Sequence, residues 1–110
     1  MVIEIANFPL APRKTEAFFN AMDQAAVLLR AAEGYLGHTV GIGVESPETA
    51  TLIVAWRSYA DHVEQFEPSE PHEQFIGMLD GLYEGEISVV HVEAESPQRP
   101  LSLSMSQNDD

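Results

Sequence analysis

The chain has 110 residues, of which 45% are hydrophobic, a length and composition that suit one domain with a single core. Its 18 acidic and 5 basic residues give a formal net charge of −13, which repels phosphate backbones and anionic lipid surfaces. Nucleic acid and membranes are therefore not expected as partners. The sequence contains no cysteine, which excludes disulfides, thiolate metal ligands and thiol nucleophiles.

Targeting signals are also not expected. No apolar run approaches the roughly 18 residues that span a bilayer. Glu4 interrupts the N-terminal segment that would have to serve as the apolar region of a signal peptide. We therefore expect a cytoplasmic protein.

The first half of the chain predicts a strand, a long helix and a hairpin. Residues 2–8 are apolar and β-branched, and prolines follow them, so we expect a first strand. Residues 13–33 predict an amphipathic helix, with Gly34 in position for a left-handed C-cap. Its apolar face consists of Phe18, Met22, Ala25, Ala26 and Leu29.

Two further strands are expected at 35–44 and 51–56, joined by a turn. In the first of them, three glycines and Thr39 alternate with larger side chains, which predicts a bulge or a close neighbour on that side. The second is apolar on both faces, as in a strand that is covered on each side.

The second half predicts two short helices and a last strand. Ser58 and Asp61 resemble a capping box for a helix that ends at Pro68. Ser69 is placed to cap the next helix, which tolerates Pro71 in its first turn. A strand at 86–94 follows. We expect one domain over 1–94 and a polar, flexible tail over 95–110.

The order β-α-β-β-α-α-β predicts an α+β, ferredoxin-like fold, with a four-stranded antiparallel sheet and helices on one face. The apolar character of both faces of the third and fourth strands means that something must cover the second face. In a chain this short, the simplest cover is a second copy, which predicts a homodimer.

Several short motifs carry a family resemblance over about residues 2–94. The motifs are Gly34-Tyr35, Glu45-Ser-Pro47, Trp56-x-Ser58, His62-x-x-x-Phe66, Ser69-x-x-His72-x-x-Phe75 and His91-Val92. In these motifs the chain resembles the antibiotic biosynthesis monooxygenase family of dimeric α+β barrels.

The resemblance implies several activities. The family contains cofactor-independent oxygenases of anthrone-type or quinol substrates, and haem-degrading enzymes. A related barrel family includes a polyketide cyclase. We expect a cofactor-free oxygenase that acts on a flat phenolic or polyketide-type molecule, with histidine as general base. The alternatives are a cyclase of the same fold and a dimeric module that binds an aromatic small molecule without turnover.

His72 and His62 are the candidate catalytic residues. In the related cyclase a histidine in a similar Pro-His position acts as base, and Pro71-His72 matches that dipeptide. A helix N-terminus disfavours the imidazolium, which keeps such a histidine able to accept a proton. The alternative is that His72 only caps its helix. His62 is predicted on an inward face, either in a pocket or as a hydrogen-bonded histidine at the edge of the core.

Four aromatic residues are candidates for holding a flat ligand by stacking: Trp56, Tyr59, Phe66 and Phe75. The alternative is that they only fill the core. Asn7 matches a functional asparagine of haem-degrading relatives. Those relatives also need a haem-ligating histidine approximately where Ile76 lies, so haem degradation is not expected. Without cysteine or a His-x-x-x-His pair, no metal site is expected either.

Overall fold

The computed structural model describes residues 1–95, so the expected tail lies almost entirely outside the described residues. The helices and strands follow the predicted order. They are β1 (Val2–Pro9), α1 (Thr15–Arg30), β2 (Tyr35–Ile42), β3 (Thr49–Trp56), the π-helical turn η1 (Asp61–Phe66), α2 (Glu70–Leu79) and β4 (Ser88–Glu93).

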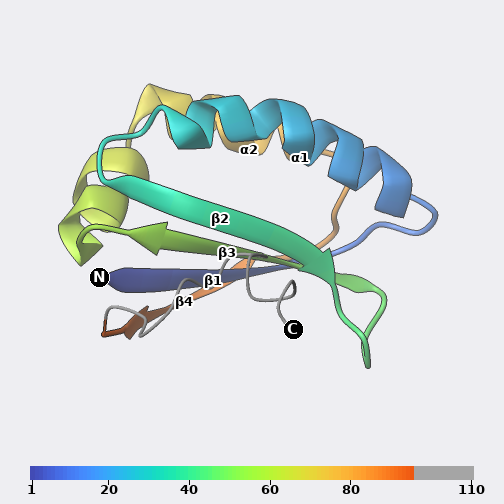
Figure 1. The fold of residues 1–110 in the computed structure, drawn as a ribbon. Helices are drawn as coiled ribbons and strands as arrows, with labels where there is room; N and C mark the ends of the chain where they lie inside the picture. Colours follow the sequence, from blue (N-terminus) through green and yellow to red (C-terminus); the bar gives the residue numbers. More distant parts are fainter. Residues whose placement is uncertain (96–110) are drawn as a thin grey trace, which may run out of the picture.

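The strands form one antiparallel sheet in the order β2-β3-β1-β4. Both α-helices lie on the same side of this sheet (Figure 1). This arrangement confirms the predicted α+β, ferredoxin-like fold. Neither helix, within residues 1–95, is long and apolar enough to cross a membrane.

Helix α1 covers the sheet with the apolar face that its periodicity predicts. Its buried residues are Phe18, Met22, Ala25, Ala26 and Leu29. The helix is shorter than the expected 13–33 because the chain turns immediately after Arg30. Gly34 has a φ of 87°, a conformation that favours glycine, and a Cβ there would collide with the carboxylate of Asp61.

The hairpin of β2 and β3 contains the predicted irregularity. The register shifts between Tyr35 and Gly37, which places a bulge at Leu36. Within the chain, a Cβ added at Gly37 or Gly41 would meet no atom within 4 Å. Because these glycines carry no side chain, they leave open space on the side of β2 that points away from the helices.

Alternation along the strands gives the sheet two different faces. On β1, Glu4, Ala6 and Phe8 are buried beneath the helices, whereas Ile3, Ile5 and Asn7 point to the other side. We call that other side the open face. It comprises Ile3, Ile5, Asn7, Gly37, Thr39, Gly41, Thr51, Ile53, Ala55, Ser88, Val90 and Val92.

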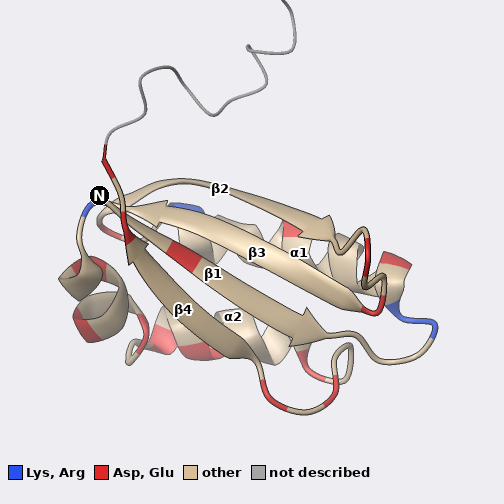
Figure 2. Ribbon diagram, turned by 90° about the horizontal axis from the view of Figure 1, so that it is seen from below, with Lys and Arg blue, Asp and Glu red and all other residues tan. Residues whose placement is uncertain are grey.

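Within residues 1–95, the open face carries no charged side chain. Glu4 and Glu93 are the only charged residues in the four strands, and the strand register places both on the helix-covered face. Figure 2 shows this side of the sheet, where acidic residues gather mainly in loops and helices around it. Three of its apolar residues are well exposed: Ile53 (38%), Val90 (55%) and Val92 (47%).

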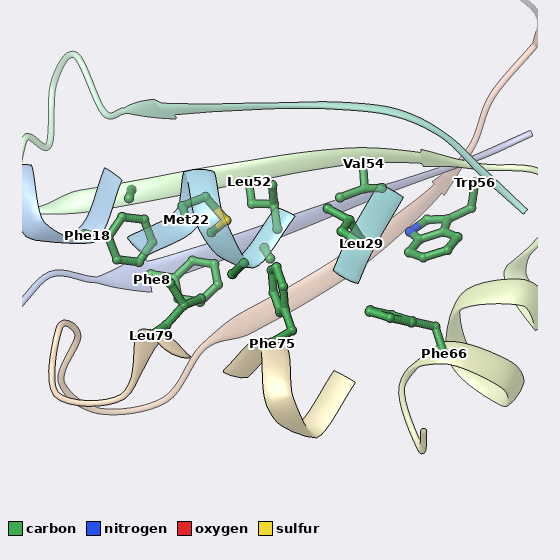
Figure 3. Packing of buried hydrophobic residues seen from close by; sticks show 13 residues of the cluster. Phe8, Phe18, Met22, Leu29, Leu52, Val54, Trp56, Phe66, Phe75 and Leu79 are labelled. Carbon is green, nitrogen blue, oxygen red and sulfur yellow. The ribbon is translucent and has the colours of Figure 1, made fainter. Parts of the chain in front are cut away.

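The core lies between the helices and the sheet. Phe8 and Phe18 pack at one end of the buried cluster, with ring centroids 5.2 Å apart. Trp56 and Phe66 pack at the other end, with ring centroids 5.5 Å apart (Figure 3). The candidate site lies close to this second end.

Candidate functional site

A cavity of about 250 Å³ lies between the sheet and the segment that contains η1 and α2. Its wall is mostly apolar, with two histidines and two glutamates. The lining residues are Glu4, Ala6, Phe8, Leu29, Leu52, His62, Phe66, Glu67, His72, Phe75, Ile76, Ile87 and Val89. Within residues 1–95, no lysine or arginine is among them, so no cation of this part of the chain neutralises the two carboxyl groups from the cavity wall.

His72 reaches this cavity from the first turn of α2. The Ser69 hydroxyl accepts a hydrogen bond from the His72 backbone N–H at 3.3 Å, which is the predicted N-cap. The His72 ring stacks on Phe75 and meets Phe66 edge-on, with centroids 6.3 Å and 5.3 Å away. Its ring nitrogens have no hydrogen-bond partner among residues 1–95. Burial lowers the pKa of His72, which keeps the ring neutral.

His62 is buried more deeply, in the π-helical turn η1. The Glu67 N–H donates to the His62 carbonyl at 2.7 Å, a bond that spans five residues and widens this turn. The His62 ring is 2% exposed and stacks on Trp56 with centroids 5.0 Å apart. Burial, followed by the charges of His91 and His72, lowers the pKa of His62 to about 4.

Both ring nitrogens of His62 are engaged. Nε2 lies 3.3 Å from Oε1 of Glu4, and Nδ1 lies 2.8 Å from Nε2 of His91. Glu4 and His91 face each other across β1 and β4 as register partners. The three side chains therefore form a continuous row, Glu4–His62–His91, which we call the buried row.

Glu4 is not among the site residues predicted from the sequence. Its side chain is 9% exposed, and its carboxyl group accepts a hydrogen bond from Trp56 Nε1 at 2.9 Å. Burial raises the pKa of Glu4 from 4.5 to about 7; the Trp56 hydrogen bond opposes this rise, and the Glu67 charge adds to it. The sequence does contain an indication that Glu4 is buried, because side chains at alternate positions of a strand point to the same face, and Ala6 and Phe8 are apolar.

The structure distributes the seven predicted site residues over three places. His62, His72, Phe66 and Phe75 line the cavity. Two others lie outside its wall but contact the buried row: Trp56 stacks on His62, and Tyr59 packs edge-on against His91 at 4.9 Å. Asn7 lies on the open face, where its Oδ1 accepts a 2.6 Å hydrogen bond from the Thr51 hydroxyl.

A second hollow of about 630 Å³ adjoins the cavity. It shares Glu67, His72 and Ile76 with the cavity wall, and adds Glu70 and Glu73. We call Glu67, Glu70 and Glu73 the acidic rim. Its charge opposes the approach of an anionic ligand. Within residues 1–95, no group of three His, Asp or Glu side chains has an arrangement that could hold a metal ion.

Comparison with known proteins identifies relatives of this fold. The family model described as antibiotic biosynthesis monooxygenase matches residues 1–77. The chain is 28% identical to the uncharacterized protein YczJ of Bacillus subtilis over 83 residues, which cover 76% of this chain and 87% of YczJ.

Two solved structures have the same fold. One is described as a putative antibiotic biosynthesis monooxygenase from Bordetella bronchiseptica, with a TM-score of 0.81, 23% identity, and coverage of 86% of this chain and 97% of that one. The other is SnoaB, a cofactor-independent oxygenase from Streptomyces nogalater, with a TM-score of 0.71, 13% identity, and coverage of 90% and 97%. The chain therefore belongs to the antibiotic biosynthesis monooxygenase family, and this membership supports a monooxygenase-like or small-molecule-binding role.

Proposed function

We propose that this protein is a cofactor-independent oxygenase of a small, flat phenolic or quinol-type compound, with His72 as its general base. The observation that carries the proposal is the placement of His72. Its ring lies on the wall of an apolar cavity, beside two phenylalanine rings, with no hydrogen-bond partner among residues 1–95. Of the two predicted histidines, it alone has ring nitrogens available to a ligand.

The chemistry requires a base and an apolar slot. His72, neutral at physiological pH, takes a proton from an O–H or an activated C–H of the bound compound. The resulting anion is electron-rich enough to transfer electrons to dioxygen directly. Phe66 and Phe75 hold the ring by stacking, and the apolar wall excludes water.

His62 has a different role in this proposal from the one first expected. Because both of its ring nitrogens are engaged by Glu4 and His91, it does not contact the substrate proton directly. It positions the carboxyl group of Glu4 instead, with Trp56 behind it. Tyr59 and Asn7 lie outside the cavity wall and make no substrate contact in this proposal.

Cavity volume and charge narrow the substrate class. A volume of about 250 Å³ lies just below the common range of ligand pockets, roughly 300–1,000 Å³. This size favours compounds of one or two rings over three-ring anthrones. The acidic rim favours neutral compounds over carboxylates. Neutral hydroquinones and dihydroxynaphthalenes fit both conditions.

The test is oxygen consumption with a panel of such compounds under air. We expect the wild-type protein to exceed the rate in buffer, and His72→Ala to lose this excess. His38→Gln is the matched control, since His38 lies on β2 with its Nδ1 2.6 Å from the Tyr35 hydroxyl, away from the cavity.

Saturable binding without oxygen uptake would identify a non-catalytic binding module. A cyclised product formed without oxygen uptake would identify a cyclase. An unchanged rate in His72→Ala would exclude His72 as the base.

We further propose that a second copy of the chain covers the open face. An uncharged face with exposed Ile53, Val90 and Val92 contrasts with a chain of net charge −13. Two such faces can approach closely because the glycines of β2 leave open space there. Light scattering tests the dimer directly, and a monomeric mass at micromolar concentration would contradict it.

A further inference from the structure

We propose that Glu4 is a second proton-transfer group of this cavity, and that His62 and His91 carry protons between its carboxyl group and the β4 edge of the sheet. The observation behind this proposal is the buried row. It joins a carboxyl group on the cavity wall to a half-buried histidine on an edge strand through two short contacts. The part of this proposal that concerns turnover rests on the oxygenase function proposed above.

The carboxyl group of Glu4 has one engaged oxygen and one available oxygen. Oε1 accepts the Trp56 N–H at 2.9 Å and lies 3.3 Å from Nε2 of His62. Oε2 has no hydrogen-bond partner among residues 1–95. Glu4 lines the cavity, and in this proposal Oε2, the oxygen without a partner in residues 1–95, is the atom that binds a ligand hydroxyl or carbonyl.

The surroundings of Glu4 allow it to hold a proton near neutral pH. The titratable groups that face it are His62 and Glu67 from η1 and its end, His72 from α2, and His91 from β4. On the cavity wall, α1 contributes only Leu29 and β3 only Leu52. In the described part of the chain, no lysine or arginine stabilises the carboxylate from the cavity wall, and burial raises the pKa of Glu4 to about 7.

The row can carry one proton inward and leave every group uncharged. With Glu4 ionised, His62 donates from Nε2 to Glu4, and His91 donates from Nε2 to Nδ1 of His62. A proton that reaches Nδ1 of His91 moves the His91 Nε2 proton to His62 Nδ1, and the His62 Nε2 proton to Glu4. The result is a protonated Glu4, with both histidines switched from the Nε2–H to the Nδ1–H tautomer.

This gives the cavity one base and one acid. His72 accepts the proton of the substrate, the resulting anion forms a C–O bond to dioxygen, and Glu4 supplies a proton to the terminal peroxide oxygen to give a hydroperoxide. His72 then releases its proton to solvent through the second hollow, which it also lines. Two groups whose environments shift their pKa values in opposite directions are typical of acid and base pairs. The row then restores the proton on Glu4 from the outside.

The tautomer switch can be measured without any substrate. In ¹⁵N NMR spectra of the histidine rings, we expect His62 and His91 to change their protonated nitrogen together, with a common midpoint near the pKa of Glu4, about 7. His38 is the internal control and should not follow this midpoint. If the protonated nitrogens of His62 and His91 are the same at pH values below and above this midpoint, the proposal is overturned.

The single tryptophan gives a second readout, because it donates directly to Glu4. We expect Trp56 emission to change across the same midpoint, and Glu4→Gln to abolish both this change and the tautomer switch. A switch that persists in a folded Glu4→Gln protein would also overturn the proposal. If this variant does not fold, the wild-type spectra still decide. Both readouts are independent of oxygen uptake, so they separate failure of the row from failure of the proposed function.

Discussion

The two faces of one sheet do different things in this protein. The helix-covered face buries the carboxyl group of Glu4 and the ring of His62 beside a cavity, whereas the open face, within residues 1–95, exposes isoleucine and valine without a charged side chain. On β1 the two faces are separated by single residues, since Glu4 lies between Ile3 and Ile5. A strand period of two is thus enough to place a reactive site and an apolar surface back to back.

The largest expected effect comes from placing a charge on the open face. Ile53 lies in the middle of β3 beside Ile5, and in a two-fold dimer Ile53→Glu would bury two uncompensated carboxylates. We expect self-association to weaken by at least about a thousandfold, which corresponds to about 4 kcal/mol. Sedimentation equilibrium measures this loss.

Val44→Glu is the matched control for this prediction. It makes the same charge change at a side chain that is 89% exposed and lies just beyond β2. The control should keep the wild-type mass. Equal masses for both variants would show that the open face is not the interface.

The next effect concerns the helix-covered face and depends on pH. The raised pKa of Glu4 means that the folded chain binds more protons than the unfolded chain between pH 4.5 and about 7. Stability therefore falls through this window as pH rises, whereas the lowered pKa of His62 makes stability rise between about 4 and 6.5. In the wild type, the two contributions offset each other.

Glu4→Gln removes only the unfavourable contribution. We compare the unfolding free energy of the variant with that of the wild type at each pH. As pH rises from acidic to mildly alkaline values, we expect this difference to change by about 3 kcal/mol in favour of the variant. Urea unfolding at both ends of the window measures this difference. A difference that does not vary with pH would contradict the raised pKa of Glu4.

The fold followed from local patterns, but the buried row did not. Periodicity identified Phe18, Met22 and Leu29 as one face of α1, because neighbouring turns of a helix place these residues together. Glu4 was read only as an interruption of an apolar segment. Its partners Trp56 and His62 are separated from it by 52 and 58 positions in the sequence, and nothing in the sequence specifies that distance in space.

The structure brings four of the predicted site residues to one cavity, but the contacts between them could not be predicted from the sequence. The pairing of β1 with β4 brings His91 beside Glu4, and residues Asp61–Phe66 form a π-helical turn instead of an α-helix. Neither the strand pairing nor the π-helical form has a periodic signature in the sequence. Asn7 was assigned by resemblance, and its position one residue before Phe8 puts it on the opposite face.

A smaller effect concerns ligand charge on the helix-covered side. The acidic rim should make a hydroxynaphthoate bind about tenfold more weakly than the matching naphthol, because its carboxylate lies near three glutamates. Calorimetry in low salt measures the ratio. High salt or Glu67→Gln should narrow it, and equal affinities in low salt would contradict a role for the rim.

The smallest effect comes from the N-cap that supports His72. Ser69→Ala removes the acceptor for the His72 N–H, which should cost about 1 kcal/mol of unfolding free energy. Because the first turn of α2 then frays, ligand affinity should fall while the dimer mass stays constant. Ser69→Asp keeps an acceptor and should retain both. A loss of dimer in Ser69→Ala would show that the two faces are coupled, since the N-cap lies on the opposite side of the sheet from the open face.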